Sequence, residues 1–385
     1  MQELERPRIV DQPERGWGSD YLAEVIRALD LVYVALNPGA SFRGLHDSLV
    51  NYLGNDDPRM LLCLHEEHAV AIAHGWAKVT GKPMGAFVHS NVGLMHATMA
   101  IFNAWCDRVP VVVLGATGAV DAARRRPWIE WIHTAKDQGA LVRDYTKWDD
   151  QPASLAAAGE SLARAKQIAT TAPQGPVYVV FGTELQEDRP AAVPAVPDMR
   201  RFAAPTPAVP APEQLAAIAQ ALVDARAPVI LAGRVSRSEL AERLNARVLT
   251  DFKLGAAFPT DHPLHAAPPA LLFGEAQSAV LRSADVILSF DWLDLGGTLR
   301  TACKDGVTAK VIQISVDQHV HRGWSMDYQG LPPVDLNVLA EPDVALPLLL
   351  DAVKALKPAQ SPRAHAQPEP RAAGADHANA PIGVR

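Results

Sequence analysis

The stretch from Leu64 to Pro83, LHEEHAVAIAHGWAKVTGKP, has the pattern of a helix set between two short apolar runs. The run before it, MLLCLH, and the run after it, MGAFVH, have the length and composition of buried strands. Two strands joined by one helix of this length pair in parallel through a right-handed crossover. This unit therefore predicts an α/β fold built on a parallel sheet.

The same alternation continues on both sides of that unit. LVYVALNPG, residues 31–39, is an apolar run that ends in a turn, and Leu45, Leu49 and Leu53 then form one apolar helical stripe. VGLMHATMAIFNAWCDR predicts a further helix and PVVVLGATG a further strand, and a helix at 153–170 and the strand VYVVFG follow. We therefore expect a doubly wound sheet with helices on both faces.

A proline-rich passage divides the chain into two parts. Residues 191–212 hold too little apolar material to pack, so they predict an interdomain linker after a first domain at 1–190. A second α/β domain is expected at 213–357, with the strands PVILAG, ARVLTDF, ADVILSFDW and AKVIQISV. The Pro- and Ala-rich end, 358–385, predicts a disordered tail. The expected fold class is thus α/β with two doubly wound parallel-sheet domains.

Composition narrows the class of protein. The 385 residues carry a formal net charge of −7, and no basic run is dense enough for a nucleic-acid groove. No apolar run reaches the ~18 residues of a membrane-spanning helix, and the charged N-terminal segment lacks the apolar centre of an export signal. Three cysteines far apart in sequence fit neither a disulfide framework nor a zinc site. We therefore expect a cytoplasmic protein that acts on a small molecule, with no nucleic-acid or membrane partner.

Three polar segments follow successive strands of the first domain. They are Asn-Pro-Gly at 37–39, His-Glu-Glu at 65–67 and His-Ser-Asn at 89–91. Ligands of an open parallel sheet bind beyond the carboxyl ends of its strands. We therefore expect a turn that permits close backbone approach, a carboxylate and a histidine to meet at one edge of the sheet.

Each segment also has an interpretation without a function. Glu66 and Glu67 open a helix, where the helix dipole favours carboxylates in any protein. His89, at the end of a strand, is often a hydrogen-bonded structural residue. A metal site is disfavoured because the order His-Glu-Glu-His differs from H-E-x-x-H, so no metal ligand is expected in this chain.

Several motifs together resemble one enzyme family. LNPGASFRGLHDSL resembles the "PGG…L…L" turn and helix of thiamine-diphosphate enzymes of the acetolactate synthase, pyruvate decarboxylase and benzoylformate decarboxylase group. HEEHAVAIAHGWAKVTGKP is similar to their H-E-x-x-A-x-x-x-A-x-G-Y-A-R-x-T-G-x-P helix, with Trp76 for Tyr and Lys78 for Arg. NAWCDRVPVVVLGATG resembles a third family segment, and FPTDHPLH resembles the F-P-x-x-H-P-L signature of the central domain. The resemblance covers roughly residues 15–350, and it implies a pyrimidine-binding domain followed by a central domain.

The resemblance assigns a role to two of these side chains. Glu66 falls on the glutamate that activates the cofactor, whose amino-pyrimidine removes the C2 proton of thiamine only when its ring nitrogen N1′ is protonated or strongly hydrogen-bonded. A carboxyl group shielded from water is the natural partner for that nitrogen. His89 falls on a histidine that implies proton transfer to reaction intermediates.

The resemblance also implies contacts for other residues. Asn37, Pro38, Gly39 and Gly93 would line the cofactor, and His96 stands where the family has Asn, which alters that cofactor contact. The segment RRRPWIEWIHTAKDQG lies on the substrate side, so the candidate substrate contacts are Trp128, Trp131 and His133. Packing in the interior is the alternative for both tryptophans.

One part of the family's active site has no counterpart in this sequence. The family holds the diphosphate and Mg²⁺ with a G-D-G motif, and here Asp-Gly occurs once, at Asp305-Gly306, without further ligands downstream. We therefore expect thiamine diphosphate and Mg²⁺ to be held with a separate diphosphate-binding subunit, and the pyrimidine domains to self-associate as α2β2 or a multiple. The reaction would be decarboxylation of a 2-oxo acid, or lyase or carboligase chemistry on a 2-hydroxyacyl compound. One alternative is a non-catalytic binding or regulatory subunit that kept the fold, and another is a diphosphate-binding domain that belongs to the same polypeptide beyond these residues.

Overall fold

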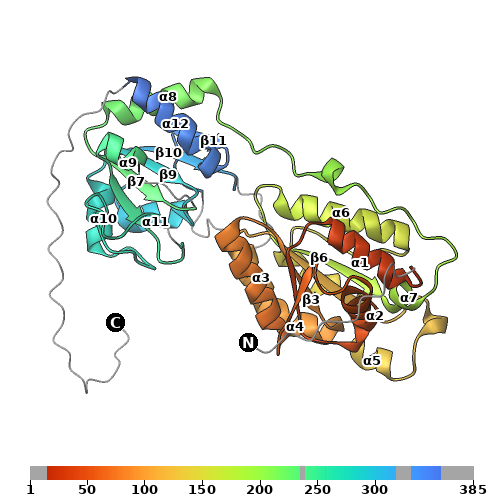
Figure 1. The fold of residues 1–385 in the computed structure, drawn as a ribbon. Coiled ribbons are helices and arrows are strands. Elements are labelled where there is room, and N and C mark those ends of the chain that lie inside the picture. Colours follow the sequence, from red (N-terminus) through yellow and green to blue (C-terminus); the bar gives the residue numbers. More distant parts are fainter. Residues whose placement is uncertain (1–14, 235–238, 256, 318–330, 357–385) are drawn as a thin grey trace, which may run out of the picture. The chain divides into compact units, whose positions relative to one another are not determined.

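A computed structural model describes residues 15–234, 239–255, 257–317 and 331–356, and it divides the chain into two compact units (Figure 1). The first unit ends at Thr206 and the second begins at Pro207, inside the proline-rich passage. The tail expected at 358–385 lies outside the described residues. Within the described part of the chain, no helix has the length and apolar character to cross a bilayer.

The first unit is built on six parallel strands. Their order is β2-β1-β3-β4-β6-β5, so β1 (Tyr33–Leu36) lies between β2 (Arg59–Leu62) and β3 (Met84–Val88). The sheet continues with β4 (Val111–Thr117) and β6 (Val177–Gly182). A two-residue strand at the edge, β5, spans residues 149–150. The predicted doubly wound parallel sheet is confirmed.

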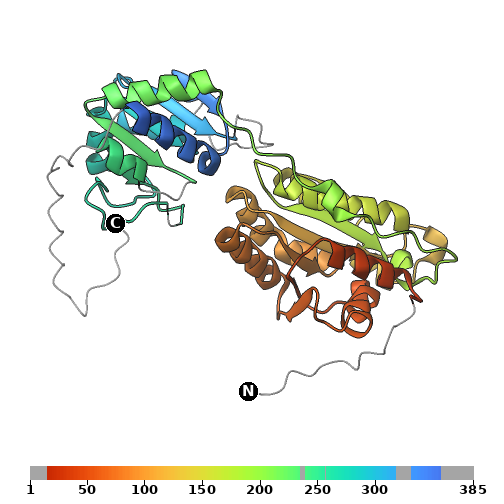
Figure 2. The same cartoon turned by 45° about the horizontal axis from the view of Figure 1, so that its top comes forward.

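Helices cover both faces of this sheet (Figure 2). Successive side chains of a strand point to opposite faces, so Val34 packs with one helical layer and Ala35 with the other. The first layer holds α1 (Gly18–Ala28), α2 (Arg43–Asp47) and α6 (Leu155–Thr170). The second layer holds α3 (Glu66–Thr80) and α4 (Ser90–Cys106), the helices that follow β2 and β3.

The ends of α3 agree with its sequence. His65 is the N-cap, where its Nδ1 accepts a hydrogen bond from the Glu67 backbone N–H at 3.2 Å. Gly81 ends the helix at φ +69°, a left-handed conformation that glycine adopts without a Cβ clash. The two caps fix where Glu66, the first residue of the helix, enters the carboxyl edge of the sheet.

Some local structure departs from the expectation. The helix expected over residues 43–54 splits into α2 and a π-helical turn at 48–52, where the N–H of Leu53 bonds to the carbonyl of Ser48. Strand β5 was not predicted, because its two residues are both Asp and carry no apolar pattern. The short helices α5 (Ile129–His133) and α7 (Thr183–Glu187) follow β4 and β6.

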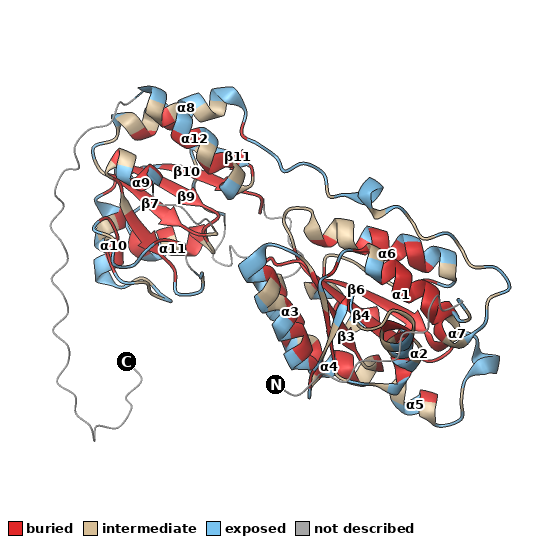
Figure 3. Cartoon of the chain, viewed as in Figure 1, coloured by how far each residue is buried: buried red, intermediate tan, exposed pale blue. Residues whose placement is uncertain are grey.

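The second unit has the same architecture with five parallel strands, one more than predicted. Their order in the sheet is β11 (Leu336–Leu339), β10 (Lys310–Ser315), β9 (Val286–Phe290), β7 (Pro228–Ala232) and β8 (Arg247–Thr250). Helices α8 (Pro212–Asp224), α9 (Glu239–Leu244) and α12 (Pro342–Leu356) cover one face. Helices α10 (Glu275–Arg282) and α11 (Leu295–Ala302) cover the other. Figure 3 shows the buried strands of each unit between their more exposed helices.

Candidate functional site

The carboxyl ends of β1 and β3 form a topological switch point of the first sheet. The chain leaves β1 for β2 on one side and returns to β3 on the other, and ligands of open α/β sheets bind at such reversals. The turn at 37–39 follows β1, Glu66 begins the helix after β2, and His89 follows β3. Asn37 is half-buried and Pro38 exposed, whereas Gly39 lies against His89.

The Glu66 carboxyl group is enclosed on several sides. The residue is 4% exposed, and a Cβ on Gly93 would lie 2.7 Å from its Oε1. Among the described residues its one hydrogen-bond contact is long, with 3.4 Å between its Oε2 and Nδ1 of His96. Buried carboxylates normally have several close partners. The Glu66 carboxyl group can therefore accept a hydrogen bond from a further donor.

Two histidines lie beside Glu66. The rings of His65 and His96 stack with centroids 4.8 Å apart and an interplanar angle of 24°. One ligand atom from each histidine and from Glu66 lies within 4.8 Å of the others, so this trio could hold a metal ion. His96 was predicted as a cofactor contact, whereas no role was predicted for His65, whose signal in the sequence is its place directly before Glu66.

His89 is held by the turn that follows β1. Its Nδ1 lies 2.9 Å from the Ser41 hydroxyl and 3.5 Å from the Ser41 backbone N–H, which donates to it. A Cβ on Gly39 would lie 2.6 Å from the Cβ and Cγ of His89, so glycine is needed there for close approach. Directly after His89, Ser90 adopts φ +47° as the chain turns into α4. The role of Ser41 was missed because nothing in the sequence distinguishes it from other turn serines.

His133, from α5, faces His89. The two ring centroids are 5.1 Å apart, and Nδ1 of His133 donates to the Ile129 carbonyl at 3.1 Å. Burial lowers the pKa of His89 and the neighbouring His133 lowers it further, whereas the Glu66 carboxylate raises it. His89 is therefore neutral near pH 7 and can both accept and donate a proton.

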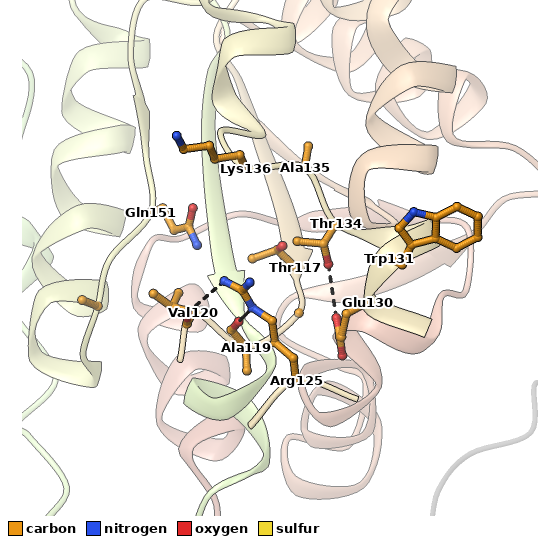
Figure 4. Close-up of a pocket in the computed structure, with 12 residues that line it drawn as sticks. Thr117, Ala119, Val120, Arg125, Glu130, Trp131, Thr134, Ala135, Lys136 and Gln151 are labelled. Carbon is orange, nitrogen blue, oxygen red and sulfur yellow. Dashed lines mark hydrogen bonds between the residues drawn. The ribbon is translucent and has the colours of Figure 1, made fainter. Parts of the chain in front are cut away.

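The two tryptophans proposed for the substrate side are exposed. Trp128 is 70% and Trp131 83% exposed, so packing in the interior is wrong for both. Trp131 lines a pocket of about 510 Å³ at the carboxyl end of β4 (Figure 4). Trp128 is not among the residues that line this pocket.

Comparison with known families gives two matches that together span more than half of the chain. Residues 16–141 match the thiamine pyrophosphate enzyme N-terminal TPP-binding domain. Residues 215–329 match the central domain of the same enzymes. The first match contains the whole candidate site, from the turn after β1 to His133.

Individual relatives are more distant. A protein of Pseudomonas aeruginosa described as a probable 2-ketoarginine decarboxylase is 29% identical over 60% of this chain and 41% of its own length. Benzoylformate decarboxylase of Pseudomonas aeruginosa is 28% identical over 54% of this chain and 38% of its own length. The matched regions thus span about 40% of these relatives.

A solved structure shows the same fold. The thiamine diphosphate-dependent 4-hydroxybenzoylformate decarboxylase of Rhodococcus jostii RHA1 matches with a TM-score of 0.72 and 23% identity. The match covers 90% of this chain and 63% of that one. At this identity the likeness concerns the fold of the two α/β units.

Proposed function

The chain belongs to the thiamine pyrophosphate enzymes through its N-terminal TPP-binding and central domains, and from this premise we propose that Glu66 and His89 form the pyrimidine side of an active site for thiamine diphosphate. When bound, thiamine diphosphate supplies a nucleophilic carbon and an electron sink for making or breaking a C–C bond beside a carbonyl. The residues of this chain would bind and orient the pyrimidine ring and move protons beside it.

The single observation that carries this proposal is the carboxyl group of Glu66. It is buried at the switch point of the sheet, yet its one contact among the described residues is the long one to His96. A ring nitrogen that brings its own proton would complete its hydrogen bonding. Gly93 leaves the space beside Oε1 that a side chain would otherwise fill. The buried Glu66 carboxyl group and the space beside it therefore fit the pyrimidine end of the cofactor.

His89 would exchange protons with the reacting group. The lowered pKa keeps the imidazole neutral near pH 7, and contacts with Ser41 and Gly39 hold the ring in one position. A neutral, positioned imidazole is the usual general acid–base group at this pH. His133, whose ring centroid lies 5.1 Å from that of His89, supplies a second imidazole to receive or return the proton.

The reaction class we favour is decarboxylation of a 2-oxo acid. The two relatives named above are described as decarboxylases, and both named substrates are 2-oxo acids. Lyase or carboligase chemistry on a 2-hydroxyacyl compound uses the same cofactor and is the second candidate.

The diphosphate and Mg²⁺ of the cofactor need ligands of their own. Mg²⁺ prefers octahedral oxygen ligands, and the sequence contains no G-D-G motif. Asp305, of the Asp-Gly pair, is exposed in the loop before β10, at the amino end of that strand. We assign the diphosphate and metal to a separate diphosphate-binding subunit.

An exposed apolar surface on α3 and α4 supports association with other chains. The side chains on the outer stripe of α3 include Ile72 and Val79, and those of α4 include Met95, Met99 and Phe102. The three α4 positions recur at four- and three-residue spacing and form a continuous apolar stripe, and Ile72 and Val79 lie seven residues apart on one side of α3. An apolar surface of this kind marks a site of protein contact. We propose pairing of pyrimidine domains here, as α2β2 or a multiple.

Calorimetry with thiamine diphosphate and Mg²⁺ tests the function. It is done on this chain alone, on the chain co-expressed with the polypeptide encoded beside its gene, and on the same pair with Glu66→Gln. We expect binding by the pair, none by the chain alone, and at least tenfold weaker binding by the variant. Tight binding by the chain alone would overturn the need for a partner. Absence of binding in every case would favour the alternative, a non-catalytic regulatory subunit.

A further inference from the structure

The pocket of about 510 Å³ beside β4 suggests a second site (Figure 4). Neither Glu66 nor His89 is among the residues that line it. Its size is in the range of pockets that bind small organic molecules. Its walls come from the end of β4, from α5 and its flanks, and from the residues after β5. Gly118 lets the α5 residue Glu130 lie directly against β4, because a Cβ there would collide with the Glu130 carboxylate.

The pocket carries an excess of positive charge. Arg125 donates from Nε to the Ala119 carbonyl at 3.0 Å and from Nη2 to the Val120 carbonyl at 3.1 Å. These two bonds fix the guanidinium but leave its charge uncompensated, since Arg125 has no ion pair within the described ranges. Lys136 adds a second cation to the lining.

The one carboxylate of the lining is already compensated. Glu130 accepts from Arg126 Nε at 2.7 Å and from the Thr134 hydroxyl at 3.2 Å. The negative charge of Glu130 therefore does not offset the positive charge of Arg125. A guanidinium held in place by backbone carbonyls has little side-chain entropy left to lose when it binds a carboxylate through its fork of N–H groups.

The rest of the lining is suited to a flat apolar body. Val120, Ala119 and Ala135 supply apolar surface, whereas the indole of the lining residue Trp131, 83% exposed, points away from them (Figure 4). Thr117 and Gln151 offer neutral hydrogen-bonding groups.

We propose that this pocket binds a small aromatic monocarboxylate, with its carboxylate on Arg125 and its ring system against the apolar surface of Val120, Ala119 and Ala135. The site is separate from the proposed cofactor site and needs neither cofactor nor partner. It uses residues of the first unit alone. Trp131, at the edge of this pocket, belongs to the segment that the resemblance puts on the substrate side, but neither the family match nor the motifs assign a ligand to Arg125.

Calorimetry on the full chain without thiamine diphosphate tests this site, so the result is independent of the proposed function. The probes are 2-naphthoate and its neutral isostere 2-naphthamide. We expect naphthoate to bind at least tenfold more tightly than naphthamide, and Arg125→Gln to remove that preference. Arg164→Gln, at an exposed arginine paired with Glu160 on α6, is the matched control and should bind as the parent does.

A second variant separates binding from folding. Ala135→Phe fills the pocket without touching the Arg125 contacts, and it should weaken naphthoate binding at least tenfold while circular dichroism matches that of the parent. Equal affinity for the two probes would overturn the proposal. Undiminished naphthoate binding by Arg125→Gln or by Ala135→Phe, or no binding by the parent at millimolar probe, would overturn it as well.

Discussion

The imidazole rings of His89 and His133 lie with their centroids 5.1 Å apart and carry complementary tautomers. The Ser41 backbone N–H can only donate, so Nδ1 of His89 accepts and the neutral ring holds its proton on Nε2. The Ile129 carbonyl can only accept, so Nδ1 of His133 donates and its Nε2 keeps a lone pair. One ring can therefore release a proton from Nε2 and the other can take one up at Nε2.

This arrangement predicts opposite shifts in the pKa of His89 for two substitutions. His133→Asn removes a second titratable imidazole whose electrostatic effect lowers the pKa of His89, so that pKa should rise. Glu66→Gln removes a negative charge that raises it, so the pKa should fall. Titration of the His89 Cε1–H signal by NMR measures both. Shifts of the same sign in the two variants would contradict the arrangement.

Two glycines on helices make a matched pair. Gly75, on α3, has open space where a Cβ would be, so Gly75→Ala should stabilise the chain by about 1 kcal/mol through helix propensity. Gly93→Ala places a methyl group against the Glu66 carboxyl, so it should weaken thiamine diphosphate binding at least tenfold. Thermal unfolding and calorimetry on the cofactor-binding assembly measure the two effects. Unchanged cofactor binding by Gly93→Ala would mean that the cofactor does not approach Glu66.

The apolar stripes on α3 and α4 predict a change in association state. A charge at Met99 would have to be buried unpaired in a contact formed there, so Met99→Glu should shift the protein toward smaller species. Ala156 is exposed on α6 in the opposite helical layer, so Ala156→Glu is the control and should leave the association state unchanged. Light scattering after size-exclusion chromatography gives the masses. The same mass distribution for both variants and the parent would exclude this surface as the contact.

Three histidines predict loss of stability in mild acid. Burial is the first cause of a lowered pKa at His46, His89 and His265. The unfolded chain protonates these groups near their ordinary pKa of about 6.5, while the folded chain does so at lower pH, so the free energy of unfolding should fall as pH drops from about 7.5 to 5.5. Urea unfolding measures it, and His46→Gln should reduce the slope. Equal stability at both ends of that range would refute the prediction.

Much of the fold could be predicted from the sequence because its strands are apolar and its helices are periodic. Five strands are buried along nearly their whole length, so each stands out in the sequence as an apolar run: β3, β4, β6, β9 and β10. The π-helical turn after α2 depends on tertiary contacts: the buried Ser48 hydroxyl bonds to Asp20, 28 positions away. Local pattern cannot contain that information.

The site could be predicted in part for the same reason. Glu66 and His89 follow strands, so the sheet topology brings them to one edge. The contacts of Ser41 with His89, and of His65 with His96, depend on the path of turns and on ring orientation. The exposure of Trp128 and Trp131 depends on the course of the segment after β4, where few apolar residues fix the chain.

We propose that Glu66 activates thiamine diphosphate, and hydrogen–deuterium exchange at C2 of the bound cofactor is the decisive test of this role. The exchange rate is followed by NMR in the assembly that binds the cofactor, with Glu66→Gln compared with Glu67→Gln. Glu67 is the exposed neighbour on the same helical turn, so its variant controls for the loss of one charge. We expect exchange to slow by about a hundredfold or more in Glu66→Gln and to be unchanged in Glu67→Gln. Parent-like exchange in Glu66→Gln would contradict the assignment.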